Sequence, residues 1–224
     1  MPKPSRSTQE IRKVKEKILD CALDIINQEG TDKLSMRKLA SRMDMSAANL
    51  YNYYKSKENI LAALDTNGFK ILFRKIKSAI NSMESPIDKI KALIREYINF
   101  GTDPLRVELY NIMLNRARVP DYKGIKGLED FVEYQTRKAF KFLDLSHKFI
   151  SDYININPKL RGRDSKILTL RIWIELHGIV AFYNNRLLNE LQYSDAFKIF
   201  SEVPKKTVSQ LTDDLIDSIV NGDL

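Results

Sequence analysis

Two short helices separated by a tight turn are predicted within the segment Ser35–Tyr53, and this pattern restricts the fold more than any other feature of the chain. Ser35 and Ser46 are the expected N-caps, because a serine hydroxyl accepts a hydrogen bond from the free N–H groups of a first helical turn. Asp44 falls in the turn, where aspartate tolerates a left-handed backbone better than most residues. A helix pair of this kind is typical of a helix-turn-helix, whose second helix enters the major groove of DNA.

The rest of the chain is expected to be helical as well. Apolar residues recur every three or four positions, which is the period of a helix with one buried side. With only 8 Gly and 7 Pro in 224 residues, long helices are favoured over a turn-rich β fold. The predicted class is all-α, with an N-terminal three-helix helix-turn-helix domain over 1–62 and a helical bundle over 63–224. The spacing predicts helices at about 8–29, 36–43, 47–53, 57–80, 87–101, 104–113, 128–156 (one long or two shorter), 164–191 and 205–220, with a loop at 119–127.

Composition disfavours several functional classes. No apolar run approaches the ~18–20 residues needed to cross a bilayer, and the first residues contain no apolar core of a secretory signal. Cys21 is the only cysteine, so no internal disulfide forms and a reducing, cytoplasmic compartment is expected. His147 and His177 do not have zinc-ligand spacing, and the sequence has no glycine-rich phosphate loop or nucleophile elbow. We therefore expect no enzymatic activity, catalytic residue, metal site or cofactor.

The net charge of +8 is concentrated near the N-terminus. Residues 1–60 hold 12 basic and 8 acidic residues, and residues 1–17 alone hold 6 basic against 2 acidic ones. An arm of this kind can contact the phosphates of a nucleic acid. A solvated tail without a partner accounts for the same charges equally well.

The second short helix carries the residues expected to read DNA. Ala47 and Ala48 open it with little bulk, so that its backbone can approach base edges. Asn49 can pair with adenine or contact a phosphate. Tyr51 and Tyr53 offer hydroxyls to phosphates from rigid stems. The alternative is that these two tyrosines only pack the domain.

Two lysines, Lys55 and Lys57, flank the start of the next helix, whose free N–H groups also favour a phosphate, although Lys57 can equally be a solvated helix end. With the preceding residues they complete a pattern that resembles the DNA-binding domain of the tetracycline-repressor (TetR) family over roughly residues 10–65. The pattern is carried by Ser35, Met36, Leu39, Ala40, Met45, Ser46, Leu50, Tyr51, Tyr54 and Lys55–Glu58. The resemblance implies core positions for Leu50 and Tyr54, and DNA contacts by Ser35, Arg37, Ser46, Asn49, Tyr51, Tyr53 and Lys57.

The sequence departs from the family pattern at three places. Asp44 replaces the turn glycine, and Lys38 stands where an acidic residue is common. Ala47–Ala48 replaces the frequent Lys-Gly pair that opens the recognition helix. This last difference concerns the DNA sequence that is read and not the fold.

The C-terminal half resembles one subgroup of the family. The run Trp173-Ile-Glu-Leu-His177-Gly178 resembles its Trp-His-Gly signature, and Phe100–Met113 resembles its Pro-Tyr-Met helix. The resemblance implies a ligand-binding and dimerisation domain over 63–224, with a dimer formed through the last two long helices. Trp173 and His177 are expected to line a ligand pocket from one helix face, and Gly178 permits close approach of a helix or a ligand. The facing wall is expected to hold Tyr97, Phe100, Tyr110, Met113 and Phe131, unless these are ordinary core residues.

The predicted function is ligand-responsive transcription regulation of bacterial type. A homodimer would place two recognition helices in successive major grooves of a palindromic double-stranded DNA operator, because one short helix reads too few base pairs. The expected partners are operator DNA, a second copy and a partly apolar small-molecule effector. Repression is the common outcome in the family, and activation stays open. Two alternatives are a regulator controlled by protein contact without a small ligand, and an all-helical enzyme or ligand carrier with a helix-turn-helix-like segment.

Overall fold

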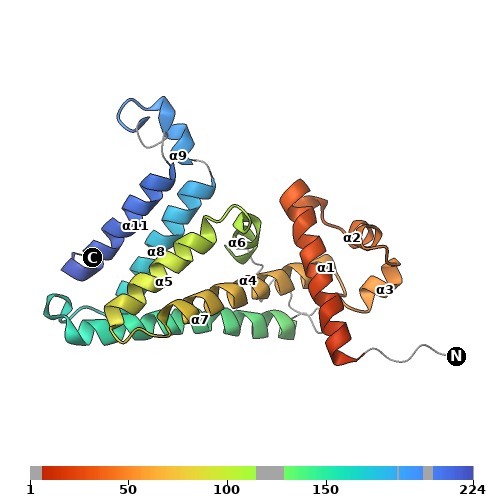
Figure 1. The fold of residues 1–224 in the computed structure, drawn as a ribbon, viewed down its shortest axis with the longest axis horizontal. Helices are drawn as coiled ribbons and strands as arrows, with labels where there is room; N and C mark the ends of the chain where they lie inside the picture. Colours follow the sequence, from red (N-terminus) through yellow and green to blue (C-terminus); the bar gives the residue numbers. More distant parts are fainter. Residues whose placement is uncertain (1–6, 115–128, 186, 199–203, 224) are drawn as a thin grey trace. The chain divides into compact units, whose positions relative to one another are not determined.

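This computed structural model describes residues 7–114, 129–185, 187–198 and 204–223, and helices joined by short turns make up this part of the chain (Figure 1). The longer helices are α1 (Thr8–Glu29), α4 (Lys57–Ile80), α5 (Pro86–Gly101), α7 (Glu129–Ile156), α8 (Ser165–Asn184) and α11 (Pro204–Asn221). The shorter ones are α2 (Met36–Arg42), α3 (Ala47–Tyr51), α6 (Val107–Leu114) and α9 (Leu187–Glu190), with 3₁₀ turns at Thr31–Lys33, Pro158–Leu160 and Leu191–Tyr193. The predicted all-α class is confirmed. None of the described helices combines the length and apolar character that a membrane span needs.

Local hydrogen bonds that the sequence encodes set the limits of the first helix. Ser7 and Glu10 form a capping box at the start of α1: the Glu10 N–H donates to Ser7 Oγ (3.3 Å) and the Ser7 N–H donates to Glu10 Oε2 (2.7 Å). Gly30 ends the helix with φ 89°, a backbone that residues with a side chain rarely adopt. The predicted span of this helix and its C-terminal glycine are confirmed.

Two predicted helix limits are wrong. Pro104 does not lie in the first turn of a helix, because the Asp103 carboxylate accepts the Leu105 N–H at 3.0 Å and holds a turn there, so that α6 begins only at Val107. The helix predicted over 164–191 is interrupted, since α8 ends at Asn184 and the short α9 follows. The loop predicted over 119–127 lies outside the described residues.

The chain divides into two compact units. The first consists of residues 1–69 and 108–137, and α1, α2, α3 and the first part of α4 supply its core. Gly68 of α4 lies closely against α6 in this unit, and a Cβ at that position would displace the side chain of Met113. The fully buried side chains here include Ile18, Ile25, Leu39, Leu50 and Ile60.

The second unit consists of residues 70–107 and 138–224, and within it α5, α8 and α11 pack on one another. The Asn184 amide donates to the Gly101 carbonyl at 2.9 Å and ties the C-terminal ends of α8 and α5 together. Its core includes Ile94, Leu176, Val180 and Ile219. Because α4 runs without a break from the first unit into the second, the domain boundary after residue 62 stays a prediction.

Candidate functional site

Helices α2 and α3 are held at their starts by their own serine caps. Ser35 Oγ accepts the Lys38 N–H and Ser46 Oγ accepts the Asn49 N–H, both at 3.2 Å. Between the helices, Asp44 has φ 49°, which is the left-handed backbone predicted for the turn. The predicted helix-turn-helix geometry of two capped helices is therefore present, and both caps are satisfied within the chain.

The third helix has a buried side and an outward side. Leu50 is fully buried and Tyr54, which follows the helix, is only 8% exposed, whereas Tyr51 between them is 43% exposed. Met36 and Met45, which belong to the same sequence pattern, are half-buried at the edge of this core. Leu50 and Tyr54 therefore anchor α3, and Tyr51 points away from the core, as the sequence predicts.

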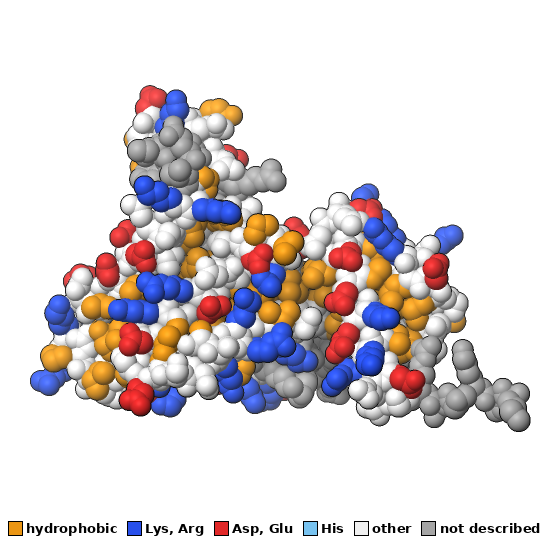
Figure 2. Space-filling view, in the orientation of Figure 1, with side chains coloured by type: hydrophobic (Ala, Val, Ile, Leu, Met, Phe, Trp, Pro, Cys, Tyr) orange, Lys and Arg blue, Asp and Glu red, His pale blue; other side chains and the backbone are white. Residues whose placement is uncertain are grey.

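None of the predicted DNA-contact residues is buried. The exposed ones are Ser35, Arg37, Ser46, Ala47, Tyr51 and Lys55, and the half-buried ones are Asn49, Tyr53 and Lys57. They all belong to α2, α3 or the chain around the start of α4, within one unit. On the visible face of α1, by contrast, basic side chains lie beside a row of acidic ones (Figure 2). The outward surface of α2 and α3 is therefore the candidate nucleic-acid interface.

Two of the basic residues on α2 are tied to α1. Lys38 donates a short hydrogen bond to the Glu29 carboxylate, and Arg42 lies 3.6 Å from the same carboxylate. The hydrogen bond from Lys38 is the main reason why the pKa of Glu29 is lowered, with the charge of Arg42 acting in the same direction. No described carboxylate pairs with Arg37, which lies with Ser35 and Ser41 around a shallow hollow on the outer side of α2. Arg37 is thus the α2 cation that is available to a phosphate.

The lysines at the start of α4 also contact the chain. Lys57 Nζ donates to the Thr31 carbonyl at 2.7 Å, and Lys55 Nζ donates to the Tyr51 carbonyl at 3.0 Å. An ammonium group has three donors, so each lysine retains donors for a phosphate. Lys57 is therefore more than a solvated helix end, because it also links α4 to the turn after α1.

Tyr54 carries a titratable group inside the first unit. Burial, and to a smaller extent the charge of Glu16, raises the pKa of Tyr54 to about 12, from an ordinary value of 10.0. Lys15 Nζ lies 5.5 Å from the centre of its ring. The unfolded chain therefore loses this proton at lower pH than the folded chain does.

Folding stability is expected to fall between pH 10 and pH 12 through Tyr54. Tyr54 contributes up to about 2 kcal/mol to the free energy of unfolding. This contribution is complete below pH 10 and is lost as the pH rises towards the pKa of the folded state. Urea unfolding of the wild-type chain and of Tyr54→Phe at pH 9 and pH 11.5 measures this contribution. The free energy of unfolding should decrease less between the two pH values in the variant than in the wild type. The free energy of unfolding of the control Tyr51→Phe, at an exposed position, should decrease as much as that of the wild type. Equal decreases in wild type and Tyr54→Phe would contradict the assignment.

Three of the predicted pocket residues meet in the second unit. The Tyr97 hydroxyl lies 3.1 Å from His177 Nε2, and the Tyr97 ring stands edge-on to that of Trp173 with centroids 5.1 Å apart. His177 Nδ1 lies 2.7 Å from the Trp173 carbonyl, so in the neutral imidazole Nδ1 carries the proton and Nε2 accepts from Tyr97. The Trp173 Nε1–H is buried and has no acceptor among the described residues. Aromatic rings and one unsatisfied donor thus lie together.

Phe142 is a member of this cluster that the sequence analysis misses. Its ring stands edge-on to Trp173 at 4.8 Å between centroids and lies 6.4 Å from Tyr97. The apolar spacing of Phe142 with Phe149 and Tyr153 along α7 marks a buried face, but nothing in the sequence pairs that face with α5 and α8. We call Tyr97, Phe142, Trp173 and His177 the aromatic cluster.

For the other predicted pocket residues the structure gives burial, and their place in a pocket stays a prediction. Phe100 is buried in the second unit, with the Arg106 guanidinium 6.0 Å from its ring centre. Tyr110 and Met113 are buried in the first unit. The side chain of Phe131 lies outside the described ones. No group of His, Cys, Asp and Glu in the described part of the chain is arranged to hold a metal ion.

Helix α8 presents a row of apolar side chains that the described residues leave exposed. The row, which we call the α8 stripe, consists of Ile167, Leu170, Ile174 and Phe182, all exposed. Their spacing of three, four and eight places them on one side of the helix. Gly178 falls in the same row, and no described atom lies within 4 Å of the place its Cβ would take. A contiguous apolar surface of this kind is typical of an interaction site.

Comparison with known proteins identifies relatives of the N-terminal segment. Residues 18–64 match the family model of bacterial regulatory proteins, tetR family. The tetracycline repressor protein class D of Escherichia coli is 38% identical over 134 residues, which are 58% of this chain and 57% of that repressor. The chain spans between 33% and 57% of the length of the curated relatives that it matches.

Two solved structures extend the likeness over both units. The regulator FadR from Bacillus subtilis, in complex with stearoyl-CoA, aligns with a TM-score of 0.65 and 15% identity over 92% of this chain and 98% of that chain. AibR, in complex with isovaleryl coenzyme A and operator DNA, aligns with a TM-score of 0.62 and 16% identity over the same shares of the two chains. At this identity the likeness shows a common fold.

Proposed function

We propose that this chain, which belongs to the tetR family of bacterial regulatory proteins, is a homodimeric DNA-binding transcription regulator that a small molecule releases from its operator. The exposed outer side of α3, held on a capped and packed helix pair, is the observation that carries the proposal. Binding to DNA implies action in the cytoplasm, and we assign the chain regulation rather than catalysis. Repression follows where the bound dimer blocks transcription.

The proposed DNA contacts fall into two chemical groups. Ala47 and Asn49 lie in the first turn of α3 and are assigned to base edges, where an amide side chain can pair with adenine. The remaining residues are assigned to phosphates, which position a protein on DNA without reading sequence. These are Ser35, Arg37, Ser46, Tyr51, Tyr53, Lys55 and Lys57. Because only Ala47 and Asn49 are assigned to bases, we expect the sequence preference to rest on few base pairs in each half-site.

Removing the Tyr51 hydroxyl is expected to weaken DNA binding without unfolding the domain. Tyr51→Phe should bind DNA selected from a random pool at least about tenfold more weakly, because a hydrogen bond to a charged phosphate contributes about 1.5–3 kcal/mol and each dimer loses two. Titrations of labelled DNA at several salt concentrations measure this. The salt dependence should not change, since no charge is removed. Tyr54→Phe is the matched control, and a loss as large in Tyr54→Phe as in Tyr51→Phe would contradict the phosphate role.

The α8 stripe supports the homodimer. A second copy is the occupant that we propose, because a two-fold axis would bring the same stripe from both chains together and cover all four apolar side chains at once. No described atom lies within 4 Å of the place that a Cβ at Gly178 would take, which leaves room for close approach of the partner helix. Helix α11 packs directly against α8, so it is placed to join the same interface.

The aromatic cluster is the proposed wall of the effector site. Its rings offer an apolar surface, and Trp173 Nε1 offers a donor that no described residue satisfies. A buried donor left unpaired costs about 1–3 kcal/mol, so an effector that accepts this hydrogen bond gains affinity. The acyl-CoA complexes of FadR and AibR make molecules with an apolar acyl part the first compounds to test. Tyr110, Met113, Phe100 and Phe131 remain proposed as further lining residues.

A further inference from the structure

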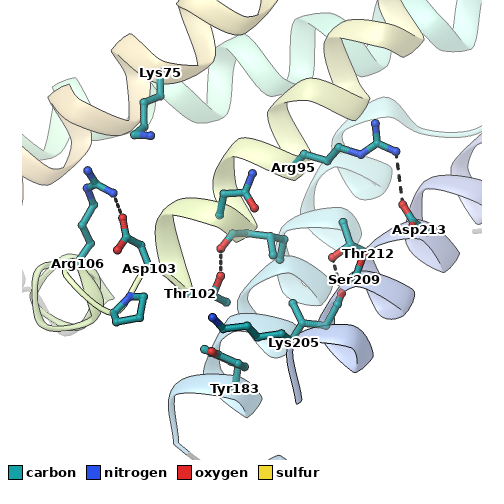
Figure 3. A pocket seen from close by; sticks show the side chains of 14 residues that line it. Lys75, Arg95, Thr102, Asp103, Arg106, Tyr183, Lys205, Ser209, Thr212 and Asp213 are labelled. Carbon is teal, nitrogen blue, oxygen red and sulfur yellow. Dashed lines mark hydrogen bonds and ion pairs between the residues drawn. The ribbon is translucent and has the colours of Figure 1, made fainter. Parts of the chain in front are cut away.

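A cleft of about 530 Å³ lies in the second unit, on a different side of α5 from the aromatic cluster. It is formed by residues of α4, α5, the turn before α6, the end of α8 and α11 (Figure 3). None of the four residues of the aromatic cluster lines it, although Tyr97 and the cleft residue Ile98 are neighbours on α5. The cleft is thus a separate cavity, and the proposed function makes no use of it.

The charges around the cleft are unbalanced. Four cations and two carboxylates line it. The carboxylates already have partners, because Asp103 is paired with Arg106, and Asp213 lies 3.4 Å from Arg95. Lys75 of α4 and Lys205 of α11 form no ion pair with any described carboxylate. Figure 3 shows the Lys75 side chain extending from α4 on the side of Asp103 and Arg106, and the Lys205 side chain extending from α11 towards Tyr183. Two positive charges are therefore left for a ligand.

The remaining lining combines apolar surface with neutral polar groups. Ile98, Pro104 and Val208 supply apolar atoms, and Tyr183 adds a ring with a hydroxyl. The hydroxyl of Thr102 donates to the Ile98 carbonyl at 2.8 Å, and the amide of Asn184, next to Tyr183, holds the ends of α8 and α5 together. The backbone around the cleft is thus fixed by hydrogen bonds. A volume of about 530 Å³ falls in the range of small-molecule sites.

The structure assigns this cleft as a binding site for a small organic anion, in which Lys75 and Lys205 bind a phosphate or carboxylate group and the surface of Ile98, Pro104 and Val208 receives a short apolar part. Charge-assisted hydrogen bonds from ammonium groups to such oxyanions are stronger than neutral ones. Lys75 lies on α4, the helix that continues into the unit with the candidate DNA surface, and Lys205 lies on α11. An anion bound between them would join α4 to α11.

Isothermal titration calorimetry with hexyl phosphate, hexanoate and hexanol tests the assignment on the full-length chain without DNA. Hexyl phosphate should bind at least about tenfold more tightly than hexanol, because hexanol has the apolar part without the charge. The double variant Lys75→Gln/Lys205→Gln should lose about tenfold or more in affinity for hexyl phosphate. The matched control Lys77→Gln/Lys206→Gln removes the same charge from α4 and α11 outside the cleft and should bind as the wild type does. Comparing hexanoate with hexyl phosphate shows which oxyanion the site prefers.

A charge-preserving variant distinguishes the loss of the two charges from a loss of the fold. Lys75→Arg/Lys205→Arg should retain affinity for hexyl phosphate, and circular dichroism checks that every variant is helical. Equal affinities of the two Lys→Gln double variants, equal affinities for hexanol and hexyl phosphate, or no detectable binding of either anion at millimolar concentration would each overturn the assignment. Since DNA is absent, these results do not depend on whether the chain is a regulator.

Discussion

Ile174→Glu is expected to make the chain monomeric and to lower its affinity for a palindromic DNA site by about 100-fold or more. Ile174 lies in the middle of the α8 stripe and is 72% exposed in the single chain, so a partner is needed to bury it. In a two-fold interface each substitution occurs twice, which brings two carboxylates into one apolar contact. Burying a charge without a partner costs far more than burying one isoleucine contributes. A monomer then holds only one half-site.

Sedimentation velocity measures the first part of this prediction, and DNA titration measures the second. Leu105→Glu is the matched control, because Leu105 is 78% exposed but lies outside the stripe, in the turn before α6. It should sediment as the wild type does. A dimeric Ile174→Glu chain with unchanged DNA affinity would show that the stripe is not the interface between the two copies.

Leu50→Ala is expected to destabilise the first unit by about 2–5 kcal/mol, because it removes a fully buried side chain and leaves a cavity. Helix α3 spans only Ala47–Tyr51, and a helix of this length is not stable by itself. Its position depends on its cap and on the packing of Leu50. The loss of DNA binding on warming should therefore occur at lower temperature than in the wild type.

The single tryptophan allows the two units to be followed separately. Trp173 lies in the second unit, so its fluorescence reports that unit, whereas circular dichroism reports all helices. In Leu50→Ala the dichroism should show an additional transition at low urea concentration while the fluorescence transition stays in place. Tyr51→Ala, at the exposed neighbouring position, should leave both transitions within the error typical of surface substitutions, about ±0.5 kcal/mol. Unchanged dichroism in Leu50→Ala would contradict the anchoring role of Leu50.

The features that the sequence predicts well are those determined by near neighbours. The caps at Ser35 and Ser46 and the left-handed turn at Asp44 each depend on residues no more than a few positions apart. The burial of Leu50 and Tyr54 follows from spacing along one helix. Pro104 shows the limit of this reasoning, because the Leu105 N–H donates to the Asp103 carboxylate and holds a turn where proline alone favours a helix start.

Contacts between distant parts of the chain could not be predicted in the same way. Tyr97 and His177 are 80 positions apart, and only the packing of α5 on α8 brings the hydroxyl to the imidazole. Phe142 joins them from α7, and nothing in the sequence distinguishes it from the other apolar residues of that helix. The contact of Lys57 with the Thr31 carbonyl could not be predicted for the same reason. The sequence gives the charge of a lysine, but not the carbonyl group to which it donates.

The most direct test of the central proposal is selection of DNA by the full-length chain from a random-sequence pool, followed by titration of the selected site at several salt concentrations. We predict an inverted repeat that binds two chains. The logarithm of the affinity should fall with the logarithm of salt concentration with a slope of about −5, because Arg37, Lys55 and Lys57 supply six cations per dimer. No enriched sequence together with a slope near zero would contradict DNA binding, and an enriched site without symmetry that binds one chain would contradict the dimer.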